Sequence, residues 1–290
     1  MSELVLFWQI YFMKQLILLG AIWLASVLSG RAATVDTVQI FSEAMQREIR
    51  AVVITPDKYR KAESVQFPVV YLLHGYSGDY ADWITKVPNI AWLADRHDII
   101  LVCPDGGFDS WYLDSSVNDS SQYETHVAQE VVSFVDEHYR TLAQPTGRAI
   151  TGLSMGGHGA LFLAIRHTDT FGVAGSMSGG VDLTYNVNNW GIKDHLGAYE
   201  EKPLRWDSLS VVNMISTLPP NQLALIIDCG TDDFFFRINQ QLHQILLDHQ
   251  SSHDYIVRPG AHNWDYWSNA IAYQLLFFSE FFEKHKVTSP

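Results

Sequence analysis

Cysteine is scarce in this chain of 290 residues, which has only Cys103 and Cys229. Two cysteines cannot form the dense disulfide framework of small exported proteins, so the chain must rely on a buried hydrophobic core. Each cysteine ends an apolar, strand-like run without a neighbouring base. That setting favours two buried free thiols over a catalytic thiol.

Basic residues are also few, since 19 Lys and Arg stand against 32 Asp and Glu, for a formal net charge of −13. Nucleic-acid binding needs clustered cations to meet the phosphates, so no nucleic-acid partner is expected. Internal repeats and low-complexity tracts are absent, and 47% hydrophobic with 18% charged residues is an ordinary globular mixture. We therefore expect one folded domain over residues 33–290.

Long uncharged apolar runs are rare, and the run 16–28 is too short for a standard membrane span. The run 16–28 is uncharged, follows Lys14 and precedes small residues, a pattern typical of a secretory signal peptide. We expect residues 1–32 to be such a signal, cleaved near Ala32, with Met13 as an alternative start. The mature protein would be secreted or periplasmic, without stable membrane association; an uncleaved anchor is the alternative.

Beyond this segment, apolar runs rich in β-branched residues alternate with amphipathic stretches. The alternation predicts an α/β fold, with a mostly parallel central sheet flanked by helices on both faces. The stretch 181–220 does not follow this alternation of strands and helices. We expect it to form a small cap-like insertion over the open end of the sheet. The expected strands are 35–41, 47–55, 69–73, 99–103, 149–151, 171–177, 223–227 and 255–257, and the expected helices are 88–96, 124–140, 155–167, 235–249 and 264–285.

A Gly-x-Ser-x-Gly motif runs from Gly152 to Gly156, directly after the expected strand 149–151. A strand that ends in Ser and turns at once into a helix is a nucleophile elbow, which exposes the Ser hydroxyl at the edge of the sheet. The glycines let strand and helix approach without a Cβ clash. We therefore expect Ser154 to be a nucleophile; the alternative is a Gly-rich turn with an inert Ser.

A Ser hydroxyl becomes a good nucleophile only when a His takes its proton. In this architecture the chain order is Ser, acid, His. His262 is the expected base, because it falls in the loop between the last expected strand and the last expected helix. The acid should follow the preceding strand, where Asp232 and Asp233 are adjacent. Spacing alone cannot choose between them, since either carboxylate could orient the imidazole.

Acyl transfer also needs two preorganised donors for the developing oxyanion. The amide of Met155, directly after the nucleophile, is expected to be one. The second should come from the loop after strand 69–73, where Gly75 permits a turn and the Tyr76 amide is the candidate; the alternative is a plain loop with a helix cap. No His, Cys, Asp and Glu spacing forms a metal-ligand set, so neither metal nor cofactor is expected.

Together these segments resemble the esterase D-type branch of the α/β-hydrolases. That branch includes S-formylglutathione hydrolases, tributyrin esterases, feruloyl and acetyl esterases, and mycolyltransferases. The resemblance implies the α/β-hydrolase fold, with Asp233 as the acid and the amides of Tyr76 and Met155 as the oxyanion donors. The matching segments are 71–75, 104–107 with 111–112, 152–160, 229–234 and 260–264.

The resemblance further implies a secreted serine ester hydrolase that forms an acyl-enzyme on acetyl, feruloyl or other short-chain esters of carbohydrates. Four aromatic side chains are candidates for a wall against an aryl or sugar ring, although ordinary packing is the alternative for each: Trp111, Tyr112, Trp190 and Trp206. Two other functions stay open, namely acyl transfer by the same triad and a non-catalytic binding role. The acyl group, the alcohol and the oligomeric state are not indicated.

Overall fold

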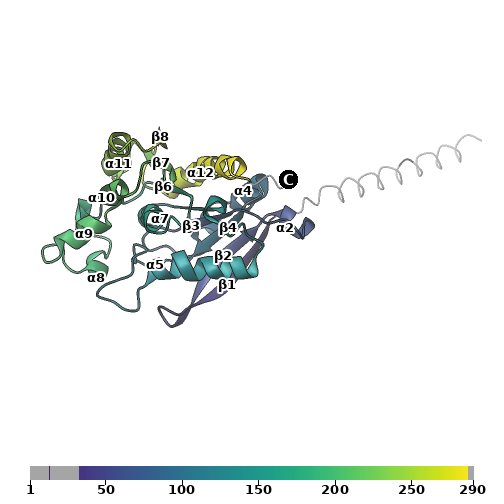
Figure 1. Ribbon diagram of the computed structural model, residues 1–290, viewed down its shortest axis with the longest axis horizontal. Helices are drawn as coiled ribbons and strands as arrows, with labels where there is room; N and C mark the ends of the chain where they lie inside the picture. The colour runs from purple at the N-terminus through teal and green to yellow at the C-terminus, as the bar shows by residue number, and fades with distance from the viewer. Residues whose placement is uncertain (1–12, 14–32, 287–290) are drawn as a thin grey trace, which may run out of the picture. The chain divides into compact units, whose positions relative to one another are not determined.

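The computed structural model describes Met13 and residues 33–286. Apart from Met13, the expected signal peptide at 1–32 therefore lies outside the described residues. Within 33–286 the chain builds an eight-stranded sheet of order β1-β2-β4-β3-β5-β6-β7-β8 (Figure 1). β1 and β4 each pair antiparallel with β2, and the other neighbours are parallel. The expected mostly parallel sheet is thus confirmed.

The strands fall close to the apolar runs that predicted them. β3, β4, β5 and β6 are buried at every residue, because helices cover both faces of the sheet. The strands are β1 (Thr34–Ser42), β2 (Arg47–Thr55), β3 (Val69–Leu73), β4 (Ile100–Pro104), β5 (Arg148–Gly152), β6 (Val173–Met177), β7 (Ala224–Gly230) and β8 (His253–Arg258).

The helices form two layers, one on each side of the sheet (Figure 1). The first layer contains α6 (Val132–His138), α7 (Met155–Arg166) and α11 (Phe236–Asp248), whose apolar side chains pack with Val69, Tyr71 and Leu73. The second contains α3 (Asp82–Lys86), α4 (Ile90–His97) and α12 (Trp264–Lys284), which pack with Val70 and Leu72. Alternate residues of β3 thus face opposite cores, as the period of two in a strand requires. Short α2 (Asp57–Lys61) follows β2.

The helix expected over 124–140 is present, but its central part is not α-helical. It begins as α5 (Tyr123–Thr125), continues as a π-helical turn over His126–Val131, and ends as α6. A π-helical turn accommodates one extra residue, and here Val127 and Val131 both stay buried against the sheet.

The insertion 181–220 leaves the sheet after β6 and returns at β7. It contains α8 (Lys193–Leu196), α9 (Pro203–Leu209) and α10 (Val211–Met214). It is tied to the loop after β4, because Trp111 Nε1 donates a hydrogen bond to the Trp190 carbonyl at 2.9 Å. His195 Nε2 also lies 3.0 Å from Asp109 Oδ1. The insertion is therefore anchored at the carboxyl ends of the strands.

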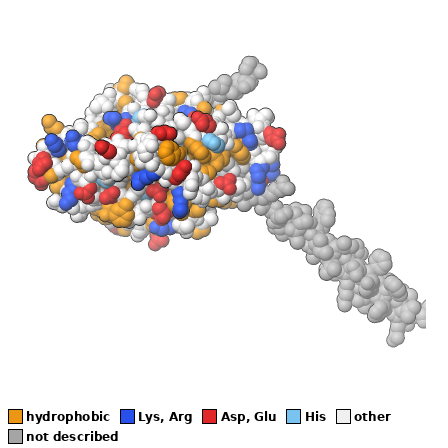
Figure 2. Space-filling model, turned by 90° about the horizontal axis from the view of Figure 1, so that it is seen from below, with side chains coloured by type: hydrophobic (Ala, Val, Ile, Leu, Met, Phe, Trp, Pro, Cys, Tyr) orange, Lys and Arg blue, Asp and Glu red, His pale blue; other side chains and the backbone are white. Residues whose placement is uncertain are grey.

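On the face shown in Figure 2, Lys and Arg side chains are interspersed with Asp and Glu. They do not gather there into a basic patch of the kind that phosphate backbones require. The acidic net charge is consistent with this distribution.

His158 is a fully buried histidine of α7. Its ring stacks on Phe162, with centroids 5.6 Å apart, and its Nε2 lies 3.1 Å from the Leu209 carbonyl oxygen. Burial lowers the pKa of His158 to about 4, because a charged imidazolium would lose its hydration there.

This lowered pKa predicts an acid-sensitive contribution to stability. The unfolded chain takes up a proton on His158 near pH 6.5 and the native protein only near pH 4, so the contribution is present at neutral pH and is lost as the pH falls. Between pH 7 and pH 4.5 the free energy of unfolding should fall by roughly 2.5 kcal/mol through this residue. Denaturant titrations of the unsubstituted protein and His158→Gln would measure it, since Gln does not titrate. Parallel pH dependences would contradict the prediction.

Candidate active site

Ser154 lies in the turn between β5 and α7, with φ 55° and ψ −117°. A non-glycine residue with positive φ is strained and is held by its surroundings. Here the surroundings are close backbones: a Cβ on Gly152 would lie 2.5 Å from the Gly156 carbonyl oxygen, and one on Gly156 would lie 2.5 Å from the His74 carbonyl oxygen. The two glycines thus let β5, α7 and the loop after β3 meet beneath the Ser154 hydroxyl.

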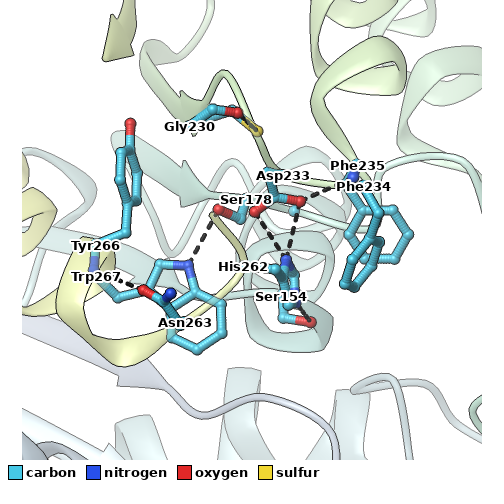
Figure 3. A network of polar contacts seen from close by, with 12 residues as sticks. Ser154, Ser178, Gly230, Asp233, Phe234, Phe235, His262, Asn263, Tyr266 and Trp267 are labelled. Atoms are coloured by element: carbon cyan, nitrogen blue, oxygen red, sulfur yellow. Dashed lines mark hydrogen bonds and ion pairs between the residues drawn. The ribbon is translucent and has the colours of Figure 1, made fainter. Parts of the chain in front are cut away.

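Three polar side chains form a hydrogen-bonded row at this point (Figure 3). His262 Nε2 lies 2.9 Å from Ser154 Oγ, and His262 Nδ1 lies 3.0 and 2.8 Å from the two carboxylate oxygens of Asp233. A carboxylate accepts, so Nδ1 carries the proton and donates, which leaves Nε2 free to accept the proton of the Ser hydroxyl. The fold brings Ser154 and His262 together across 108 residues of sequence.

The two adjacent carboxylates of the β7 loop lie in different surroundings. The Asp233 side chain is fully buried, and its Oδ1 also accepts a hydrogen bond from the Phe235 amide at 2.8 Å. Asp232 is exposed, and its amide donates to the Gly260 carbonyl at 2.9 Å, which joins the β7 and β8 loops. The geometry places Asp233, and not Asp232, on the imidazole.

Aromatic rings enclose the imidazole of His262, whose side chain is 13% exposed. The Phe234 ring lies 4.1 Å away between centroids, and the edge-on rings of Trp267 and Phe235 lie 4.8 and 5.3 Å away. Trp267 is itself fixed, because its Nε1 donates to Ser178 Oγ at 3.0 Å. This packing restricts the imidazole to the orientation that meets both Ser154 and Asp233.

The expected oxyanion donors lie at the same end of the sheet. Met155 is the first residue of α7, and the first amides of a helix have no acceptor within it. In the loop after β3, the Ser77 amide donates to the Phe108 carbonyl at 2.7 Å, whereas no acceptor for the Tyr76 amide is found among residues 33–286. A Cβ on Gly75 would lie 3.4 Å from Ser154 Cβ, so this loop passes directly beside the serine.

The His74 side chain holds the loop after β3 in place by hydrogen bonds, a role that the sequence did not indicate. Its Nε2 accepts a hydrogen bond from the Gly106 amide at 2.7 Å, so its Nδ1 carries the proton and donates to the Gly75 carbonyl at 2.8 Å. The Tyr112 hydroxyl donates to the His74 carbonyl at 3.0 Å. The only available signal was the His-Gly pair at the end of a buried strand.

The expected aromatic wall needs correction. Trp111, Tyr112 and Trp206 are each exposed by 2% or less and serve as packing residues. Full burial is possible because their polar atoms find internal acceptors; Trp206 Nε1, for example, donates to the Gly197 carbonyl at 3.0 Å. Only Trp190 of the four borders the pocket beside Ser154.

That pocket has a volume of about 250 Å³. Its lining includes Ser154, the loop 75–78, and the side chains of His262, Phe234 and Trp190. The sequence did not indicate Phe234 as a pocket residue, because its place beside His262 depends on contacts between distant segments. Among the residues that the structure describes, no group of three or more His, Cys, Asp or Glu side chains could hold a metal ion. No helix in this part of the chain is long and apolar enough to cross a membrane.

Known proteins resemble this chain in sequence and in fold. The Esterase family model, described as "Putative esterase", matches residues 42–278. An acetyl esterase of Caldicellulosiruptor saccharolyticus is 26% identical over 256 residues, or 81% of this chain and 94% of that protein. The diacylglycerol acyltransferase/mycolyltransferase Ag85A of Mycobacterium gordonae is 25% identical over 279 residues, or 84% and 79%. A solved ferulic acid esterase superposes with a TM-score of 0.75 at 25% identity, covering 87% of this chain and 99% of its own.

Proposed function

This chain belongs to the Esterase family of α/β-hydrolase-fold carboxylic ester hydrolases, and we propose that it cleaves esters through a triad of Ser154, His262 and Asp233. One observation carries the proposal: the continuous hydrogen-bonded row from Ser154 Oγ through the imidazole to the buried Asp233 carboxylate. This arrangement matches the roles of nucleophile, base and orienting acid.

The reaction follows from the positions of these groups. Ser154 Oγ attacks the ester carbonyl carbon while His262 Nε2 takes the hydroxyl proton, and the amides of Tyr76 and Met155 receive the developing oxyanion. The tetrahedral intermediate collapses, His262 gives its proton to the leaving alcohol, and an acyl-serine remains. Water, deprotonated by the same imidazole, then attacks the acyl-serine, and the imidazolium returns the proton to Ser154 Oγ as the acid leaves. Asp233 holds the productive tautomer and stabilises the imidazolium.

For the substrate we propose acetyl, feruloyl or other short-chain esters of carbohydrates. The names of an acetyl esterase relative and of a ferulic acid esterase with the same fold support this class. We also propose that the enzyme acts outside the cytoplasm after cleavage near Ala32, on the strength of the short apolar run 16–28. Neither proposal requires a metal or cofactor.

Acyl transfer is the second candidate, because the chain also matches a mycolyltransferase over 84% of its length. The two reactions share the acyl-enzyme and differ only in what attacks it. Product analysis separates them: the purified protein is given an acetyl or feruloyl ester with and without an acceptor sugar. We expect free acid as the main product in both cases. A new sugar ester as the main product would favour acyl transfer.

A further inference from the structure

Two aromatic rings stack along one side of the pocket beside Ser154. The planes of Trp190 and Phe234 are inclined by 13°, with centroids 5.9 Å apart, and both residues line the pocket. Trp190 comes from the insertion after β6, and Phe234 comes from the loop after β7, next to Asp233. We refer to Trp190 and Phe234 as the ring wall.

The ring wall is held in place although it reaches solvent. The Trp190 carbonyl accepts a hydrogen bond from Trp111 Nε1 at 2.9 Å, and the Phe234 carbonyl accepts one from the Tyr185 hydroxyl at 2.9 Å. The Phe235 ring packs edge-on against Trp190 at 5.2 Å. Phe234 nevertheless remains 47% exposed. A fixed, exposed aromatic surface in a pocket is typical of a site that a ligand covers.

The backbone of Trp190 supports the same interpretation. Its φ is 59° and that of Gly191 is 70°, so a bulky residue sits in the left-handed region that favours glycine. Such conformations cost free energy and cluster at functional sites, where the surroundings impose them. Here the strained turn directs chain 186–191 so that an indole lines the pocket.

We propose that the ring wall is a stacking subsite for the face of an uncharged ring carried by the ester, either an aryl ring of the acyl group or a sugar ring of the alcohol. The inference rests on the proposed function and adds the residues that select the substrate. Aromatic faces attract other π faces and the C–H faces of sugars. The nearest charges in the pocket, Lys86 and Asp82, pair with each other at 3.0 Å, and the chain as a whole carries −13, so a polyanionic ring is disfavoured.

Trp190 is the residue to test, because Phe234 lies against the imidazole and Trp190 contacts Phe234 instead. The experiment compares four esters: methyl ferulate and methyl propionate, which differ in the acyl ring, and acetylated xylobiose and ethyl acetate, which differ in the alcohol ring. In Trp190→Ala we expect KM to rise about ten-fold for a ring-bearing ester, with kcat nearly unchanged. The KM of both ring-free esters should rise much less, and Trp190→Phe should restore part of the affinity.

The matched control is Trp92→Ala, which removes a 55% exposed tryptophan of α4 outside the pocket and should change none of the four KM values. A rise confined to methyl ferulate assigns the acyl ring, and one confined to acetylated xylobiose assigns the sugar ring. An equal effect on all four esters, or no effect on any, overturns the inference.

Labelling distinguishes failure of the subsite from failure of the proposed function. Methyl ferulate or acetylated xylobiose should slow fluorophosphonate labelling of Ser154 in the unsubstituted protein, and Trp190→Ala should weaken that protection about ten-fold. Labelling without protection by either ester would overturn the subsite alone. Absence of labelling would instead count against the triad.

Discussion

Ser154→Ala is expected to lower kcat for ester hydrolysis by about 10⁴- to 10⁶-fold, because among the described residues only the Ser154 hydroxyl hydrogen-bonds the imidazole of His262. Residual turnover should come from the oxyanion donors and substrate binding alone. The substitution removes only the hydroxyl, and alanine at φ 55° carries backbone strain similar to that of serine, so the folded structure should persist. The measurement is kcat on a simple ester, with thermal unfolding as the check on folding.

Ser178→Ala is the matched control for this substitution. Ser178 is a buried serine with φ 51°, directly after β6, but its hydroxyl accepts from Trp267 instead of meeting the imidazole. We expect Ser178→Ala to keep fluorophosphonate labelling and to lose at most about ten-fold in rate, through the orientation of His262. Full activity in purified Ser154→Ala would refute the triad.

Asp233→Asn should lower kcat by about 10⁴-fold, the cost of holding the wrong imidazole tautomer. An amide beside Nδ1 can donate to that nitrogen, which moves the proton to Nε2, where it blocks acceptance of the Ser154 proton. The shape of the side chain is unchanged, so the hydrogen bond from the Phe235 amide should survive.

The neighbouring Asp232→Asn provides the comparison, since it makes the same chemical change one residue away. Asp232 is exposed and its amide, not its carboxylate, joins the two loops, so we expect kcat/KM within about two-fold of the unsubstituted protein. A large loss in Asp232→Asn with little loss in Asp233→Asn would reverse the assignment. Both variants can be assayed on one ester at one pH.

The sequence predicted the strands well because buried parallel strands leave long apolar runs, as in Val69–Leu73. It also predicted that Ser154 and His262 would meet, since both follow parallel strands at the carboxyl end of one sheet. Asp232 and Asp233 could not be separated by spacing, because the difference between them is burial, which depends on how the β7 loop packs. Only the family resemblance favoured Asp233.

The burial of individual aromatic residues could not be predicted from the sequence. Trp206 looked like a ligand-binding residue because its neighbours are polar, yet it is fully buried. Its indole donates to the carbonyl of Gly197, and nothing in the local sequence reveals such a pairing. Phe234 is the opposite case, since it is 47% exposed beside the imidazole, and its position depends on how the β7 loop packs. Contacts between distant segments decide both cases.

Trp111 and Tyr112, adjacent residues with φ 53° and 59°, support two different parts of the site. Trp111 donates a hydrogen bond to the carbonyl of Trp190. Tyr112 donates one to the carbonyl of His74, beside the expected oxyanion loop. Variation at this dipeptide would therefore disturb substrate choice and reaction rate together. Variation within the insertion could exchange Trp190 while Tyr112 and His74 stay in place. Evolution or laboratory selection for a new ester should accordingly accumulate changes in 181–200 and conserve the dipeptide.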